Sequence, residues 1–503
     1  MSNKNSFILT IFVLFIGLTL FSTILMNHTR AESEFEKWKN QELASFQEFK
    51  DKRDKEFTRF LNRQWKEFKL FAGHKIYEKP KPVKSPVAPL KEAGKKEAFG
   101  GKIIEKIPVT EPEKEIKEPS LDKKPIIKEP HYEIPGESVT IDFFGISITT
   151  AYDPLMKINL KGKIDKKTIS SSWEKLSKTH YESTLNDIQR YKNDLQLNDW
   201  GYYFLIHNIA NGIYGEKNAN EIELFTWFIL TKSGYEARIG YNENKINLLL
   251  PSNNTIFGAP FIQLGTKNYY AISFDETQKH LGSLYTYNGS YPEADHLMDN
   301  NIRVSPHITN TMSTKILDFS YQGKHYEIPV TFNEKLVEFF RFYPQTNFTI
   351  YFSASVSDEA AASLIKGLKP HILGKTEGEA VNFLLRFMQT AFEYKTDAEQ
   401  FGREKYLLSE ETLYYPFSDC EDRSFLFAFL VNKLTGLDVI GLHYPNHLAT
   451  AVRFTDDIKG DSIVNNGTRY IICDPTYINA DIGMAMPRFK NITPKIITFN
   501  RAT

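Results

Sequence analysis

Three residue types that can carry out nucleophilic catalysis occur in order near the C-terminus of the chain. Cys420 begins an amphipathic run that ends near Gly436, as a helix would. His447 stands at the entry of an alternating, strand-like run, and Asp474 ends a second such run. A helix start stabilises a thiolate, an imidazole transfers protons, and a carboxylate orients the imidazole. The pattern therefore predicts acyl transfer through a thioester on Cys420.

Other roles for these residues remain open at the level of the sequence. His443 is a rival base, although His447 directly precedes its strand. Asp474 is alternatively a turn cap, and its neighbour Cys473 is predicted to be a buried apolar residue on the other side of the strand. A disulfide between Cys420 and Cys473 would abolish the chemistry. A metal site built from Cys420, the two histidines and the aspartate lacks compact spacing. Because the neighbours of Cys420 are acidic or polar, we expect this cysteine outside the core.

The order of these features resembles that of the transglutaminase-like cysteine-protease superfamily. The matching stretch covers residues 378–487 and ends its second strand with Asp-Pro-Thr. The resemblance implies a papain-type α+β domain in which Cys420 is the nucleophile, His447 the base and Asp474 the orienting acid. The Leu-Ala pair after the histidine departs from the Ala-Trp that is common in that family, which leaves the substrate groove undefined. We expect no cofactor and no metal, since no nucleotide loop or compact calcium loop is present.

A second, degenerate copy of the pattern lies upstream. A shift of 202 residues places a helical run ending at Gly234 opposite the run ending at Gly436. Each copy follows a hairpin-like β segment. The first copy has Asn218, Lys245 and Ile272 at the positions of the cysteine, histidine and aspartate, so we predict a catalytically inactive scaffold. Chance similarity between two amphipathic helices is the alternative.

The C-terminal copy has extra residues just before its cysteine. This segment, at about 394–417, is predicted to form a lid or a wall of the substrate cleft. Tyr414 and Tyr415 either line the cleft, support an oxyanion hole with the Cys420 amide, or only pack.

The N-terminus begins with an apolar segment. Residues 7–25 are 19 residues without a charge, close to the ~20 that a membrane-spanning helix needs. We favour an uncleaved single-pass anchor in the cell membrane, with the bulk of the chain periplasmic or extracellular. The alternative is a signal removed after Ala31, which would make the protein secreted.

Aromatic residues with a period of eleven follow the apolar segment. The two series are Phe35, Phe46, Phe57 and Phe68, and Trp38, Phe49, Phe60 and Phe71. Eleven residues make three helical turns, so residues 31–73 are predicted to form one long helical stalk that joins copies of the chain into a homo-oligomer. The alternatives are a helix on a membrane surface and a helix that docks on a partner. Residues 74–137 are rich in Pro, Lys and Glu and are predicted to be an extended tether.

Composition limits the remaining choices. The chain has 503 residues, 62 basic and 62 acidic side chains and two cysteines, so it is neither a disulfide scaffold nor an evident nucleic-acid-binding protein. Among the finer expectations are one helix over 170–194 and a strand over 349–357. The predicted units are 1–30 anchor or signal, 31–73 stalk, 74–137 linker, 138–290 degenerate module, 291–355 β-rich connection and 356–503 catalytic domain.

The prediction for function is a membrane-tethered, extracytoplasmic thiol enzyme that acts on a protein or peptide substrate. Hydrolysis of peptide or carboxamide bonds is favoured over cross-linking, because no amine-binding site is recognisable. The alternative is a non-catalytic scaffold in which both papain-like modules bind a partner.

Overall fold

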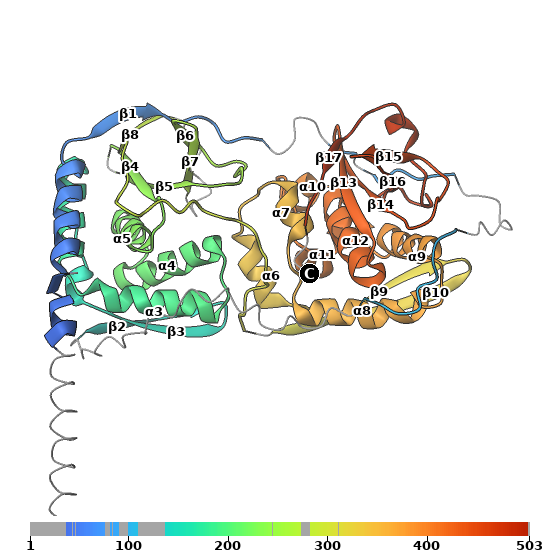
Figure 1. The fold of residues 1–503 in the computed structure, drawn as a ribbon, viewed down its shortest axis with the longest axis horizontal. Helices are drawn as coiled ribbons and strands as arrows, with labels where there is room; N and C mark the ends of the chain where they lie inside the picture. Colours follow the sequence, from blue (N-terminus) through green and yellow to red (C-terminus); the bar gives the residue numbers. More distant parts are fainter. Residues whose placement is uncertain are drawn as a thin grey trace, which may run out of the picture.

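Two α+β modules follow one another along the chain (Figure 1). The computed structural model describes residues 37–42, 44–45, 47–75, 81–82, 84–89, 99–108, 136–243, 245–272, 282–309 and 311–500.

The first module begins with an antiparallel hairpin and continues with helices that cover a sheet. The hairpin strands and helices are β2 (Glu137–Phe143), β3 (Ile146–Tyr152), η1 (Pro154–Met156), α2 (Lys166–Ser177), α3 (Tyr181–Asp194), α4 (Asp199–Tyr214) and α5 (Ala219–Lys232). The later strands are β4 (Arg238–Asn242), β5 (Lys245–Pro251), β6 (Phe261–Leu264), β7 (Lys267–Ile272) and β8 (Ser283–Tyr287). With β1 (Trp65–Lys69) they form a sheet in the order β1-β8-β4-β5-β7-β6.

The second module repeats this plan. It comprises β9 (Met312–Tyr321), β10 (Lys324–Asn333), α6 (Glu334–Arg341), α7 (Phe348–Ser353), α8 (Asp358–Ile372), α9 (Glu377–Thr390), β11 (Glu393–Tyr394), α10 (Asp397–Phe401), α11 (Ser409–Tyr414), β12 (Phe417–Ser418) and α12 (Cys420–Thr435). The sheet strands and a short helix complete it: β13 (Asp438–Tyr444), β14 (His447–Arg453), β15 (Ser462–Asn465), β16 (Thr468–Cys473), η2 (Pro487–Phe489) and β17 (Lys495–Ile497).

The two sheets share one strand order. In the second module the order is β15-β16-β14-β13-β17, which matches β6-β7-β5-β4 in the first. In each module an antiparallel hairpin and a buried helix precede that sheet, as the internal repeat in the sequence predicts. The register differs by one residue, however, because Ile272 lies opposite Leu248 whereas Cys473 lies opposite Thr450. Ile272 therefore takes the place of Cys473, and the position of Asp474 falls on residue 273, outside the described residues.

The aromatic stalk is a wrong prediction. Within the described residues the helix that includes 47–60 ends at Leu61, and the chain then forms β1 (Trp65–Lys69), which pairs with β8. Phe57 is buried, with its ring 4.7 Å from that of Trp173 in the first module. Asp54 accepts a hydrogen bond from Lys232 at 2.5 Å. These side chains are used within the chain's own core, so the repeat does not form a free-standing helix.

The predicted membrane-spanning helix also needs correction. In the part of the chain that the structure describes, no helix has both the length and the apolar character needed to cross a membrane. The segment 7–25, on which the prediction rested, lies outside the described residues. The single-pass anchor, and the membrane localisation derived from it, therefore have no structural support.

Parts of the predicted tether pack against the second module. Val87 forms a parallel bridge with Ile478, and Ile103 forms an antiparallel bridge with Thr376. Lys81 is buried. These contacts show that the described residues between 81 and 108 belong to the folded body.

Two local predictions were wrong. The helix expected over 170–194 is divided into α2 and α3, because Asp153 accepts a hydrogen bond from the backbone N–H of His180 at the break. The strand expected over 349–357 contains the helix α7 instead, since its aromatic residues pack on α12; the rings of Phe352 and Phe425 are 4.8 Å apart.

Candidate active site

Cys420 is the first residue of α12, a helix that is buried along almost its whole length. Asp419 is its N-cap, and Gly436 ends it with a φ of 73°, the left-handed conformation that glycine adopts most easily. The connection to β13 is short, so β13 runs back along α12. Sixteen helical residues span ~24 Å and seven strand residues ~23 Å. The start of α12 and the turn before His447 therefore lie at the same end of the layer that α12 and β13 form together.

His447 and Asp474 come together at that end of the sheet. β14 and β16 are antiparallel neighbours. This arrangement brings His447, the first residue of β14, close to Asp474, the residue that follows β16. The Nε2 atom of His447 is 2.8 Å from Asp474 Oδ2, and the imidazole stacks on the Phe489 ring at 5.2 Å. A proton on Nε2 is donated to the carboxylate, which leaves Nδ1 as the basic nitrogen. Backbone N–H groups of Thr476 and Tyr477 hold the other carboxylate oxygen at 2.9 and 3.2 Å.

The thiol of Cys420 does not contact this pair. Its side chain is fully buried and donates a hydrogen bond to Glu421 Oε2 at 2.9 Å. Because side chains alternate along a strand, His447 and Leu448 point to opposite faces of the sheet. The hydroxyl of Ser424 on α12 donates a hydrogen bond to the Leu448 carbonyl at 3.1 Å. The structure thus assembles the histidine and aspartate, whereas the cysteine is hydrogen-bonded to its neighbour Glu421 and not to His447.

The environment of the thiol opposes ionisation. Burial, and then repulsion from Glu421 and Asp419, raises the pKa of Cys420 well above its usual range, and Lys81 offsets this only in part. Two sequence-based expectations are therefore wrong, namely an exposed cysteine and a pKa lowered by the helix start. The physical reason is that the neighbouring acidic residues fold inward with it.

Those acidic residues form a buried carboxylate cage around the ammonium group of Lys81. Its Nζ lies 2.6 Å from Asp419, 2.7 Å from Glu421, 2.8 Å from Glu404 and 3.2 Å from Asp397. The Lys81 side chain is 1% exposed. Lys81, a residue of the predicted linker, thus neutralises part of the negative charge that is clustered at the start of α12. Without a nearby cation, burial of these carboxylates would be very unfavourable.

The pKa values of the cage follow from this crowding. Burial and repulsion from Asp419 raise the pKa of Glu421 to about 8. Burial, followed by Asp419, also raises the pKa of Asp397 well above its usual range. Burial alone would lower the pKa of Lys81, but attraction to Asp419, Glu421 and Asp397 outweighs it and raises that pKa. These shifts favour the charged form of Lys81 and the protonated forms of Glu421 and Asp397.

The same cage contains groups whose ligand atoms could hold a metal ion. Asp419, Cys420 and Glu421 form one such group, and Asp397, Asp419 and Asp422 form another, with ligand atoms within 4.8 Å of one another. Oxygen-rich sets of this kind suit hard divalent cations. The Lys81 ammonium lies against both groups, so a metal and the lysine would compete for the same carboxylates.

The segment at about 394–417 forms one wall of the cage. The carboxylates of Asp397 and Asp422 accept the backbone N–H groups of Lys405 and Leu407 at 3.0 and 2.9 Å. The second of these bonds ties the segment to the start of α12, and the first lies within the segment itself.

The tyrosines that we singled out in this segment lie elsewhere. Tyr414 packs on Phe332, and the Tyr415 hydroxyl accepts a hydrogen bond from Arg341. Tyr394 and Tyr406 are the tyrosines beside the cage, and the pKa of each is raised by burial and by acidic neighbours.

The rival residues find structural roles. His443 lies opposite Leu448, on the other face of the sheet from His447, with its ring 5.1 Å from that of Phe348. Cys473 is buried in the core and, like Cys420, is a free cysteine. The disulfide considered from the sequence is therefore not formed.

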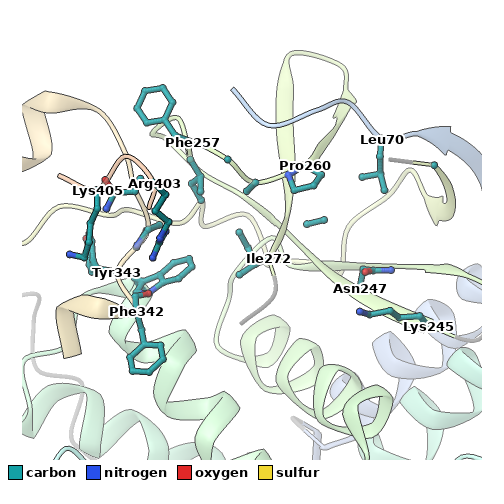
Figure 2. Close-up of a pocket in the computed structure, with 18 of the residues that line it drawn as sticks. Leu70, Lys245, Asn247, Phe257, Pro260, Ile272, Phe342, Tyr343, Arg403 and Lys405 are labelled. Atoms are coloured by element: carbon teal, nitrogen blue, oxygen red, sulfur yellow. The ribbon is translucent and has the colours of Figure 1, made fainter. Parts of the chain in front are cut away.

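A cavity lies between the first and second modules. It has a volume of about 1800 Å³ and is lined by Lys245 and Ile272 of the first module and by Arg403 and Lys405 of the second (Figure 2). The residues that surround the start of α12 with Cys420, above all Lys81 and Asp397, were not among those predicted from the sequence. A lysine in a Pro-rich segment and an isolated aspartate look like solvated residues, and no local signal distinguishes them.

Comparison with known proteins found no matching family model, no matching curated protein and no matching solved structure. The likeness to the transglutaminase-like superfamily rests on the residues and their order alone.

Proposed function

We propose that this protein is a thiol hydrolase that cleaves peptide or carboxamide bonds, with Cys420 as nucleophile, His447 as base and Asp474 as the residue that orients the base. The observation that carries the proposal is the pair of His447 and Asp474 at 2.8 Å, at the same end of the layer as the start of α12. A carboxylate-bound imidazole with a basic Nδ1 is the group that a thiol needs for activation.

The reaction follows from these roles. His447 Nδ1 accepts the thiol proton while Sγ bonds to the carbonyl carbon of the substrate. The tetrahedral intermediate expels the amine, which takes the proton from the imidazolium, and a thioester remains. Water then attacks the thioester, releases the carboxylic acid and restores the thiol. Asp474 stabilises the imidazolium throughout.

The proposal requires the thiol to leave Glu421 and turn toward the imidazole. The described state is therefore a closed form of the enzyme, in which Lys81 and Glu421 hold the start of α12. The hydrogen bond that holds the thiol on Glu421 also favours the other candidate function, a non-catalytic binding module. A fully buried cysteine that is hydrogen-bonded to a carboxyl also suits a non-catalytic binding module.

A hydrolysis assay with a library of peptide amides separates the two functions. It is run on the full chain and on a Lys81→Met variant, which removes the ammonium from the cage. We expect hydrolysis that is lost in Cys420→Ala and His447→Ala but retained in the matched control Cys473→Ala. Absence of hydrolysis by both the wild-type protein and Lys81→Met, or hydrolysis that survives Cys420→Ala, would refute the enzyme.

A further inference from the structure

A short linker segment crosses the candidate active site. This strap consists of the described residues 81–82 and 84–89, and it is separated by more than 300 residues from the elements that it contacts. At one end Lys81 lies in the carboxylate cage beside Cys420. At the other end Ala88 is buried in the cluster that includes Phe489, the residue that stacks on His447. The strap thus runs from the cage beside the proposed nucleophile to the apolar cluster that includes the ring stacked on its base.

The strap is held through its backbone as a bound peptide would be. Ala88 N–H donates to the Ile478 carbonyl at 2.7 Å, and Ile478 N–H donates to the Pro86 carbonyl at 2.9 Å. The Pro82 carbonyl accepts a hydrogen bond from the Tyr394 hydroxyl at 2.9 Å. Backbone pairing of this kind is how extended peptides add to the edge of a domain.

The sequence of the strap is already suited to an extended form. The strap has a proline at positions 82, 86 and 89, and a residue before proline avoids the helical region. An extended Pro-rich segment loses little conformational entropy when it binds. Lys81 immediately precedes Pro82, so its side chain is presented from a stiff backbone.

The cage adds a strong and specific anchor. Four carboxylates lie within 3.2 Å of Lys81 Nζ, and Oδ1 of Asp419 is buried without a hydrogen-bond partner. Carboxylates buried in this number require a cation. A lysine on a flexible stem reaches such a position, whereas an uncharged side chain would leave the charges uncompensated.

We infer that the path of the strap over the second module is a binding site for an extended, proline-containing polypeptide whose lysine side chain enters the carboxylate cage beside Cys420, and that the strap occupies this site in cis. This inference rests on the proposed function in one respect only, which is that the occupant of the site competes with the substrate of the enzyme. The peptide site itself does not depend on thiol chemistry. While the strap is bound, Cys420 is covered.

Accessibility of the thiol is the first test. Full-length wild type, Lys81→Met and the matched control Lys84→Met, whose lysine is exposed on the same strap, are treated with iodoacetamide at neutral pH. Alkylation of each cysteine is followed by mass spectrometry. We expect Lys81→Met to raise the rate at Cys420 at least tenfold, because exposure of the thiol outweighs the loss of the ammonium charge that favours its thiolate, and Lys84→Met to leave the rate unchanged. Equal rates at Cys420 in all three proteins would overturn the inference.

Cys473 reports on the integrity of the fold. It is fully buried in the core, so faster alkylation of Cys473 identifies a variant that has unfolded. In that case Ala88→Arg, which displaces the other end of the strap, replaces Lys81→Met. Failure of this variant also to expose Cys420 while Cys473 stays protected would count against the strap.

Binding in trans is the second test. A fluorescent peptide of residues 81–89 is titrated into the Lys81→Met, Cys420→Ala double variant, and its anisotropy is measured. We expect at least tenfold weaker binding when the lysine of the peptide that corresponds to Lys81 is replaced by methionine. Equal binding of both peptides, or of neither, would overturn the inference. Specific binding without any hydrolysis in the assay above would instead remove the proposed function and leave the peptide site in place.

Discussion

A buried carboxyl group in the first module allows a sharp test of the structure. Glu223 lies on α5, its side chain is 14% exposed, and its Oε2 atom is buried without a hydrogen-bond partner. The nearest histidine nitrogen, Nε2 of His207, is 3.9 Å away, too far for a hydrogen bond. Burial raises the pKa of Glu223 to about 8, and burial lowers the pKa of His207 to about 4.

The sign of the effect on stability follows from the direction of the shift. A carboxyl with a higher pKa in the folded state binds its proton more tightly when folded. Stability is therefore greatest below the unfolded pKa of 4.5 and falls as the pH rises toward about 8. At ~1.4 kcal/mol per pH unit the full loss is about 5 kcal/mol. Because the side chain keeps 14% exposure and water reaches part of it, we expect roughly half of that.

Glu223→Gln removes the titration while keeping the size and polarity of the group. Urea unfolding of wild type and variant at pH 5 and pH 8 gives the free energy of unfolding at each pH. From pH 5 to pH 8, the free energy of unfolding of the variant should rise by about 2 to 3 kcal/mol relative to that of the wild type. Glu216→Gln, at an exposed position just before the same helix, is the matched control and should gain nothing. A difference for Glu223→Gln that does not change with pH would refute the reasoning.

Two further predictions test the core and the dyad. Phe57→Ala should lower the free energy of unfolding by about 3 to 5 kcal/mol, because the ring is buried against Trp173, whereas Phe49→Ala, at a residue that is 51% exposed, should cost less than about 0.5 kcal/mol. Urea unfolding measures both, and equal effects would show that the N-terminal helix does not dock on the first module. Asp474→Asn should slow thioester formation by about 10³- to 10⁴-fold, because the carboxylate no longer sets the His447 tautomer. Single-turnover kinetics on Lys81→Met measures this rate, and a change of less than about threefold would exclude Asp474 from the proposed role.

Local patterns predicted much of the second module. The start of α12 at Cys420, its end at Gly436 and the start of β14 at His447 all follow from amphipathic and alternating runs and from a glycine stop. The meeting of His447 and Asp474 also follows from strand order, because the start of one antiparallel strand lies beside the end of its neighbour.

The repeat of eleven shows where a local pattern becomes ambiguous. The aromatic spacing correctly indicated a helix up to Leu61, but it cannot say which surface the stripe covers. Phe57 packs on its own module because Trp173 and Tyr291 supply a matching aromatic surface from residues far away in the chain. Beyond the turn, strand pairing with β8 prevailed over helical periodicity.

The sequence alone was sufficient to place the chemistry-bearing residues at the ends of their helices and strands, since capping, periodicity and turn residues act within a few positions. Tertiary structure was needed to establish their surroundings. Lys81 meets Asp419 and Glu421 over a separation of more than 300 residues, and this contact, together with burial, sets the charge state of the site. Electrostatic energy depends on distance in space and on exclusion of water, and neither is encoded in spacing along the chain. For that reason Cys420 looked like an activated thiol in the sequence and is a buried thiol with a raised pKa in the structure.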